Sequence, residues 1–157
     1  MNEWLITRAA GPTDLADVEA LFRDYADGLS VDLAYQDFAG ELASLPGAYA
    51  PPRGAILIAR VDDRAVGCVA MRPMSQPGAC EMKRLHVREA TRGTGLGRAL
   101  AEAIIDTARA AGYRCLRLDT LPDMQAAQAL YRALGFEPIP AYYDTPVSGT
   151  LFMEKAL

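Results

Sequence analysis

The sequence has few cysteines and no long apolar run, and both absences narrow the classes of protein that it can encode. Its three cysteines, Cys68, Cys80 and Cys115, lie far apart and lack the paired spacing of a zinc site. An odd number of cysteines without a CxxC pair is typical of reduced thiols, so we expect a cytoplasmic protein. No stretch approaches the roughly 18 apolar residues of a membrane-spanning helix, and we therefore expect no membrane partner.

The N-terminal segment and the net charge exclude further classes. The first residues, from Met1 to Arg8, contain neither a basic segment nor a long apolar stretch, so we expect no signal peptide. The formal net charge is −4 at pH 7. Non-specific nucleic-acid binding requires a basic face, and we therefore expect no nucleic-acid partner.

The length and the pattern of apolar residues predict one mixed α/β domain over residues 1–157. The chain is 51% hydrophobic and 23% charged, which suits a single core with a polar surface. Hydrophobic spacing and turn residues place a strand first, then two helices, a three-strand meander, a strand–helix–strand unit, a helix and a hairpin. Such an order requires a partly antiparallel sheet. The predicted strands are 4–9, 55–59, 65–71, 80–87, 116–118 and two within 136–157, and the predicted helices are 12–28, 33–45, 96–111 and 124–134.

A glycine-rich loop, Arg92-Gly93-Thr94-Gly95-Leu96-Gly97-Arg98, precedes the longest predicted helix. Glycines let the backbone turn tightly and bring its N–H groups close to a ligand. The first N–H groups of a helix have no intrahelical partners, and the helix dipole makes this end positive, so a pyrophosphate fits there. Arg92 and Arg98 would add charge-assisted hydrogen bonds. The alternative is a plain connection with two solvated arginines.

The same loop also admits dinucleotide binding, as in a nucleotide-dependent oxidoreductase. Gly93-x-Gly95 opens a strand–turn–helix–strand unit, and Asp119 follows at about the ribose-binding distance of ~20 residues. Two features count against this hypothesis. Arg98 stands where a small residue must allow helix–strand packing, and the loop begins several residues after Val87, whereas a dinucleotide turn starts at the strand end.

Two segments resemble recurring motifs of the GNAT N-acetyltransferases. Arg92-Gly93-Thr94-Gly95-Leu96-Gly97 is similar to Arg/Gln-x-x-Gly-x-Gly/Ala, and Ala127-Gln128-Ala129-Leu130-Tyr131-Arg132-Ala133-Leu134-Gly135-Phe136 is similar to A-x-x-L-Y-x-x-x-G-F. The close resemblance covers residues 81–136. It implies the GNAT acyl-CoA N-acyltransferase fold, a central mixed sheet flanked by helices. In this fold the strand ending at Val87 and the strand at 116–118 run parallel and splay apart.

The resemblance implies acetyl-CoA as the cosubstrate, held in the wedge between those two strands, and no metal. The pantetheine arm would pair with the backbone of Leu85, His86 and Val87. The pyrophosphate would lie on the amides of residues 93–98, where Leu96 offers only its backbone. Many family members carry an asparagine at the position of Met124, so an amide contact with CoA is absent here and a core or pocket-lining thioether is expected.

Acetyl transfer to an amine requires a base for the amine and a proton for the departing thiolate. By the resemblance, Tyr131 matches the family tyrosine that points at the thioester sulfur, and we expect it to contact the cofactor and act as the acid. Packing at helical spacing is its alternative. Glu81 aligns with the glutamate that is the base in histone-acetylating relatives, acting directly or through water. The alternative is a glutamate paired with Lys83 or Arg84.

Several other polar residues each admit a structural and a functional role. His86 is the only histidine, and on a strand its side chain points opposite to Leu85 and Val87, so we expect it to pack away from the thioester. Asp119 would line the acceptor pocket or cap a turn. Tyr142, Tyr143 and Asp144 would touch the acceptor or lie at a surface turn, and Asp24, Asp32, Asp37 and Glu41 would attract a cation or form a solvated face.

The sequence therefore predicts an N-acetyltransferase that moves the acetyl group of acetyl-CoA to a primary amine of a small acceptor. We expect direct attack in a ternary complex. A non-catalytic sensor of acyl-CoA with the same fold is the alternative function. The resemblance also allows a homodimer.

Overall fold

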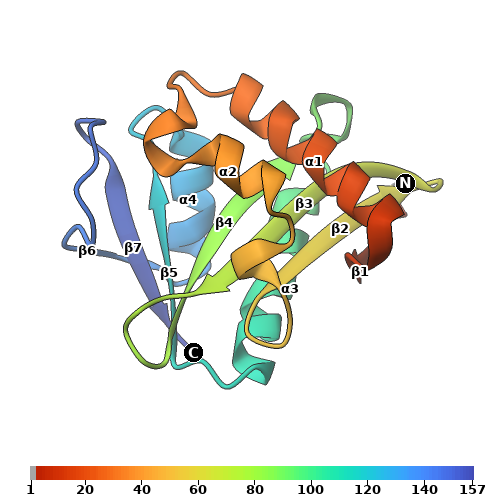
Figure 1. Ribbon diagram of the computed structural model, residues 1–157. Helices are drawn as coiled ribbons and strands as arrows, with labels where there is room; N and C mark the ends of the chain where they lie inside the picture. Colours follow the sequence, from red (N-terminus) through yellow and green to blue (C-terminus); the bar gives the residue numbers. More distant parts are fainter. Residues whose placement is uncertain (1–2) are drawn as a thin grey trace.

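The computed structural model describes residues 3–157, so Met1 and Asn2, at the start of the segment for which we expect no signal peptide, lie outside the described residues. Figure 1 shows a twisted sheet with helices on both faces. Within residues 3–157 the sheet has seven strands in the order β1-β2-β3-β4-β5-β7-β6. The strands are β1 (Leu5–Arg8), β2 (Ala55–Val61), β3 (Arg64–Pro73), β4 (Ala79–Val87), β5 (Cys115–Thr120), β6 (Glu137–Ile139) and β7 (Leu151–Ala156).

In the described part of the chain, four α-helices and three short 3-10 helices cover the sheet. Helices α1 and α2 lie on one face, and α3 and α4 lie on the other (Figure 1). Among residues 3–157, no helix has both the length and the apolar character needed to cross a membrane. The helices are α1 (Gly11–Asp27), α2 (Phe38–Ala43), α3 (Leu96–Ala110) and α4 (Gln125–Ala133), with the 3-10 helices η1 (Leu33–Gln36), η2 (Gly47–Tyr49) and η3 (Glu89–Thr91).

Alternation along the strands separates two hydrophobic cores. On β2, Ile56 and Ile58 face the core of α1, whereas Leu57 and Ala59 face the core of α3. Successive side chains of a strand point to opposite faces, and helical residues three or four apart share one face. The buried residues Val18, Leu21 and Phe22 of α1 and Leu96, Leu100 and Ile104 of α3 follow that spacing. These two cores fix the helices on the sheet.

The predicted elements are confirmed, apart from the helix predicted over residues 33–45. That segment forms η1 and α2, separated by Asp37, whose φ of 53° is left-handed. A right-handed helix cannot continue through such a residue, and aspartate tolerates this conformation better than most side chains. Asp32 begins η1 by accepting a hydrogen bond from the Ala34 N–H at 2.8 Å. The break lets η1 and α2 face different parts of β4.

A β-bulge interrupts the pairing of β3 with β4. Cys68 lies opposite His86 and Ala70 lies opposite Lys83, so β4 carries one residue more than β3 between these pairs. Arg84 lies within the bulge with a φ of 62°. A bulge changes the alternation of side chains. As a result, neighbouring Lys83 and Arg84 both reach toward η1 and α2.

Candidate active site

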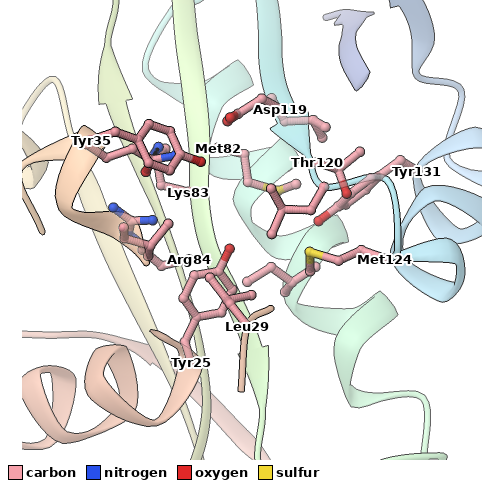
Figure 2. A pocket seen from close by; sticks show the side chains of 15 residues that line it. Tyr25, Leu29, Tyr35, Met82, Lys83, Arg84, Asp119, Thr120, Met124 and Tyr131 are labelled. Atoms are coloured by element: carbon pink, nitrogen blue, oxygen red, sulfur yellow. Dashed lines mark hydrogen bonds between the residues drawn. The ribbon is translucent and has the colours of Figure 1, made fainter. Parts of the chain in front are cut away.

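The parallel strands β4 and β5 pair over three positions only, and a pocket lies where they separate. The last pair is Glu81 with Arg117, after which β4 continues to Val87 without a β5 partner. The predicted splaying of these strands is therefore confirmed. The pocket is lined from α1, η1, β4, β5 and α4 (Figure 2). We call it the wedge pocket, and its lining includes Tyr25, Tyr35, Gln36, Met82, Lys83, Leu85, Asp119, Thr120, Met124 and Tyr131.

Tyr131 projects from α4 into the wedge pocket. Its side chain is buried, and its hydroxyl points toward the centre of the pocket near Met124 (Figure 2). Burial is the main cause that raises the pKa of Tyr131 well above its usual value of 10, so the hydroxyl remains protonated and able to donate. Met124 lines the same pocket, so of its two predicted positions, in the core or in the lining of a pocket, the second is confirmed.

The glycine loop adopts the turn that the sequence predicted at the start of α3. Gly93 and Gly95 have φ angles of 77° and 89°, a left-handed conformation that glycine adopts without strain. The first helical hydrogen bond of α3 runs from the Ala99 N–H to the Gly95 carbonyl. The amides of Leu96, Gly97 and Arg98 precede it and have no intrahelical acceptor. The loop therefore fits a phosphate group.

Side chains of the loop also have partners within the chain. Arg92 donates from Nε to the carbonyl oxygen of Val87 at 3.0 Å, and Thr94 donates to the Thr91 carbonyl at 2.7 Å. Arg98 forms an exposed ion pair with Glu102 at 3.5 Å. Each guanidinium has five N–H donors, so these contacts leave donors for a ligand. Leu96 is fully buried in the core, and only its backbone faces the loop.

His86 faces α1 and lies outside the wedge pocket, as predicted. Its Nε2 lies 2.6 Å from Oδ2 of Asp24, and its ring makes an edge contact with Tyr25. Burial, partly offset by Asp24, lowers the pKa of His86 below 6.5. In contrast, the Leu85 side chain on the opposite face lines the wedge. The side chain of His86 therefore stabilises the packing of α1, and only its backbone remains a candidate for cofactor contact.

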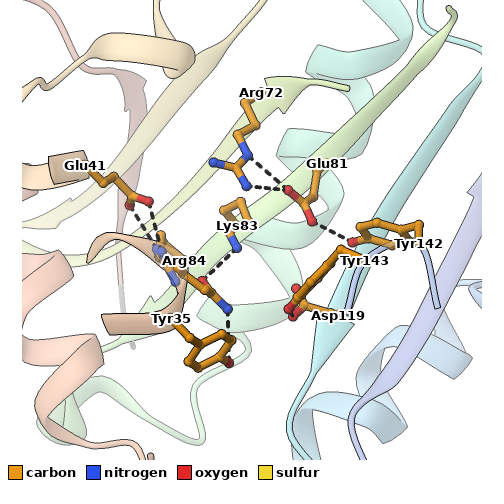
Figure 3. A network of polar contacts seen from close by, with 10 residues as sticks. Tyr35, Glu41, Arg72, Glu81, Lys83, Arg84, Asp119, Tyr142 and Tyr143 are labelled. Carbon is orange, nitrogen blue, oxygen red and sulfur yellow. Dashed lines mark hydrogen bonds and ion pairs between the residues drawn. The ribbon is translucent and has the colours of Figure 1, made fainter. Parts of the chain in front are cut away.

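Both carboxylate oxygens of Glu81 accept hydrogen bonds, from partners that the sequence did not predict for it. Oε1 accepts from Nε of Arg72 at 3.0 Å, and Oε2 accepts from the Tyr142 hydroxyl at 2.6 Å (Figure 3). The expected alternative partners were wrong, because the bulge directs Lys83 to Gln36 and Arg84 to Glu41. Arg72 lies directly opposite Glu81 in the β3–β4 register. A carboxylate has about four acceptor positions, so Glu81 retains room for one more donor.

A second cavity adjoins the wedge pocket, and we call it the acceptor cavity. It is lined from η1, β3, β4 and the segment before β7, and it shares Tyr35, Gln36 and Lys83 with the wedge pocket. Tyr142 and Tyr143 both lie in this lining, and their contact with an acceptor stays a prediction. Its lining includes Tyr35, Gln36, Arg72, Met74, Glu81, Lys83, Tyr142 and Tyr143.

Sequence reasoning did not identify Arg72 or Lys83 as residues of the site. The run of charge on a central strand was a usable signal for Lys83, because a buried charge requires a specific reason. Arg72 carried no local signal. It enters the site only through the register that places it opposite Glu81.

Comparisons with known proteins agree with this architecture. A family model described as the Acetyltransferase (GNAT) family matches residues 15–136. An uncharacterized N-acetyltransferase of Schizosaccharomyces pombe is 40% identical over 143 residues, which cover 90% of this chain and 88% of that protein. An IAA acetyltransferase of Azospirillum brasilense is 41% identical over 111 residues, which cover 69% of this chain and 71% of that protein.

A solved structure supports the same relationship. A Klebsiella pneumoniae protein described as an acyl-CoA N-acyltransferase aligns with a TM-score of 0.74 and 33% identity. The alignment covers 98% of this chain and 97% of that protein. Fold and sequence therefore point to the same family over almost the whole chain.

Proposed function

Because the chain belongs to the GNAT acetyltransferase family, we propose that it transfers the acetyl group of acetyl-CoA to a primary amine of a small acceptor, with both substrates bound together. One observation carries the proposal. The separation of β4 and β5 after Glu81 and Arg117 opens a pocket that contains Tyr131 and adjoins a cavity containing Glu81. The two pockets can hold a donor and an acceptor side by side.

The residues present fit the cosubstrate, which supplies an acetyl thioester when bound. The edge of β4 beyond Glu81 has no β5 partner, so backbone groups of Leu85, His86 and Val87 that face this edge are proposed to pair with the amides of a pantetheine arm. The Val87 carbonyl would then share its acceptor positions with Arg92. The unpaired amides at the start of α3 suit a pyrophosphate. We assign cofactor binding to these residues and to Arg92, Gly93, Thr94, Gly95, Leu96, Gly97, Arg98 and Tyr131.

Tyr131 is the proposed general acid. In the transfer, the acceptor nitrogen forms a bond to the acetyl carbon while the carbon–sulfur bond breaks, and the nitrogen loses one proton while the sulfur gains one. The Tyr131 hydroxyl supports delivery of that second proton because its raised pKa keeps it protonated. Its position in the wedge is a further support.

Glu81 is the proposed general base, acting through a water molecule. Arg72 and Tyr142 hold its carboxylate in one orientation, and the remaining acceptor position can hold a water against the incoming amine. The acceptor cavity includes Glu81 in its lining. We further propose a cytoplasmic location, since the thiols of Cys68, Cys80 and Cys115 are all free.

The test is a thiol-release assay with acetyl-CoA and a panel of amino acids, polyamines and aromatic amines. We expect at least one acceptor to release CoA, and mass spectrometry of that product to show an added acetyl group. Calorimetry with CoA is the accompanying control. Binding of CoA without transfer to any acceptor would favour the acyl-CoA sensor, and absence of CoA binding would overturn both functions.

A further inference from the structure

The amino group of Lys83 lies at the junction of the wedge pocket and the acceptor cavity. Burial lowers its pKa below the usual 10.5, so a bound anion would stabilise the ammonium form. The residue is 6% exposed, and its Nζ donates to Oε1 of Gln36 at 3.0 Å. None of the ion pairs formed within residues 3–157 includes Lys83. An ammonium has three donors, and burying a cation without a counter-charge is costly. Lys83 therefore retains capacity for an anionic ligand.

The neighbouring carboxylates already have cationic partners of their own. Glu81 pairs with Arg72 at 3.0 Å, and Glu41 pairs with the buried Arg84 at 2.9 Å. Neither alternative for Glu41 holds, because its carboxylate is neither free to attract a cationic acceptor nor part of a solvated face: it is largely buried and pairs with Arg84. Of the basic side chains Arg72, Lys83 and Arg84 near this junction, Lys83 is the one that has no ion-pair partner among the described residues.

A complementary negative group lies across the wedge pocket on β5. Asp119 lines that pocket and accepts a hydrogen bond from the Tyr143 hydroxyl. Like Lys83, it takes part in none of the ion pairs of the described residues. Figure 3 shows Lys83 and Asp119 on the two sides of the gap between β4 and β5. The two parted strands therefore present opposite charges, each with one neutral partner.

We infer that Lys83 and Asp119 recognise the zwitterion of a free amino acid, whose carboxylate binds Lys83 and whose amino group faces Asp119. This inference rests on the proposed function and names its acceptor class. An amino group at Asp119 lies in the same pocket as Tyr131, where the acid is required. The side chain of the amino acid then extends into the acceptor cavity, because Lys83 lines both spaces.

The experiment compares each standard amino acid with the amine that it gives on decarboxylation, for example tyrosine with tyramine. We expect kcat/KM to favour the amino acid by at least about tenfold, since a carboxylate paired with a buried cation contributes more than about 1.4 kcal/mol.

Three variants test the two residues separately. Lys83→Met should reduce this preference to about onefold by raising KM for the amino acid. Asp119→Asn should raise KM for both compounds and leave the kcat/KM preference for the amino acid unchanged. Lys155→Met is the matched control, because Lys83 and Lys155 are the two lysines of the sequence.

Three results would overturn the inference while leaving the proposed function intact. They are equal use of amines with and without a carboxylate, an unchanged preference in folded Lys83→Met, and a fall in kcat for both compounds in that variant, which would make Lys83 a base. If no acceptor is acetylated although CoA binds, the proposed function fails. The inference is then decided by calorimetry of the same amino acids with CoA present, where binding lost in Lys83→Met supports it and no binding refutes it.

Discussion

Glu81 and Arg117 face each other as the last paired residues of β4 and β5. Beyond this pair β4 runs on to Val87, and the bulge at Arg84 brings two consecutive cationic side chains to the face of α1 and α2. The end of β4–β5 pairing therefore opens the wedge pocket, and the bulge supplies the charged lining that the wedge pocket shares with the acceptor cavity. The first predictions concern the chemistry in that space.

Replacing Tyr131 with phenylalanine is expected to lower kcat on the order of 100-fold, because it removes the proton donor but keeps the ring. The ring packs against Phe136 at 5.8 Å between centroids, so the fold should remain. Calorimetry should show a CoA dissociation constant within about threefold of the wild type. Unchanged turnover would remove Tyr131 from the role of acid.

Glu81→Gln is expected to lower kcat by about 100-fold, because the amide cannot accept the amine proton through water. Tyr142→Phe keeps the carboxylate and removes only the hydrogen bond at 2.6 Å, so its loss should be smaller. Steady-state kinetics on both variants, with CoA binding as control, give the comparison. An equal loss in the two variants would indicate that Glu81 acts by positioning Tyr142.

Gly95→Ala should weaken CoA binding, whereas Gly112→Ala should not. Both glycines have a φ of 89° and space for a methyl group, so alanine costs each site about 1–2 kcal/mol of backbone strain. They lie at opposite ends of α3, and only Gly95 belongs to the proposed phosphate loop. Melting temperatures should therefore fall alike, while calorimetry separates the variants. Equal CoA affinities would contradict the assignment of the loop.

Glu41→Gln is expected to reduce the free energy of unfolding by about 3 kcal/mol, because it leaves buried Arg84 without its counter-charge. Glu102→Gln is the matched control on the surface. Its pair with Arg98 is about half exposed on both sides, and its loss should cost less than about 0.5 kcal/mol. Urea unfolding monitored by circular dichroism measures both. If the free energy of unfolding fell by a similar amount in the two variants, burial of the Glu41–Arg84 pair would not increase its contribution to stability.

Stability is expected to fall as the pH is lowered from about 7.5 to about 5.5, because of His86. Burial lowers the pKa of His86 below 6.5 in the folded state. As the pH falls, the histidine of the unfolded chain is therefore protonated first, which favours unfolding. At about pH 7.5, one unit above the unfolded pKa of about 6.5, neither state binds that proton, and the penalty vanishes. His86→Gln should flatten the dependence in urea unfolding, since the sequence has no other histidine. A wild type that is more stable at the lower pH would mean that the contact with Asp24 outweighs burial.

The sequence by itself determined most of the secondary structure, apart from the break at Asp37, and the position of the glycine loop. Hydrophobic period, turn residues and left-handed glycines are local properties, and each acts within a few residues of Gly93, Gly95 or the buried face of α3. For the same reason the spacing of the loop and Tyr131 was sufficient to indicate the family. The side-chain direction of His86 also followed from the strand period alone.

Only the tertiary structure decided which charged groups meet. Arg72 reaches Glu81 through the β3–β4 register, and Tyr142 reaches it from 61 positions away in the sequence. The bulge at Arg84 reverses the alternation that would have placed Lys83 and Arg84 on opposite faces. Register and bulge are properties of two paired strands, and the shift between Cys68 and Ala70 cannot be located from the pattern of either strand alone. The amino-acid site proposed at Lys83 and Asp119 therefore appears only when β4 and β5 are set side by side.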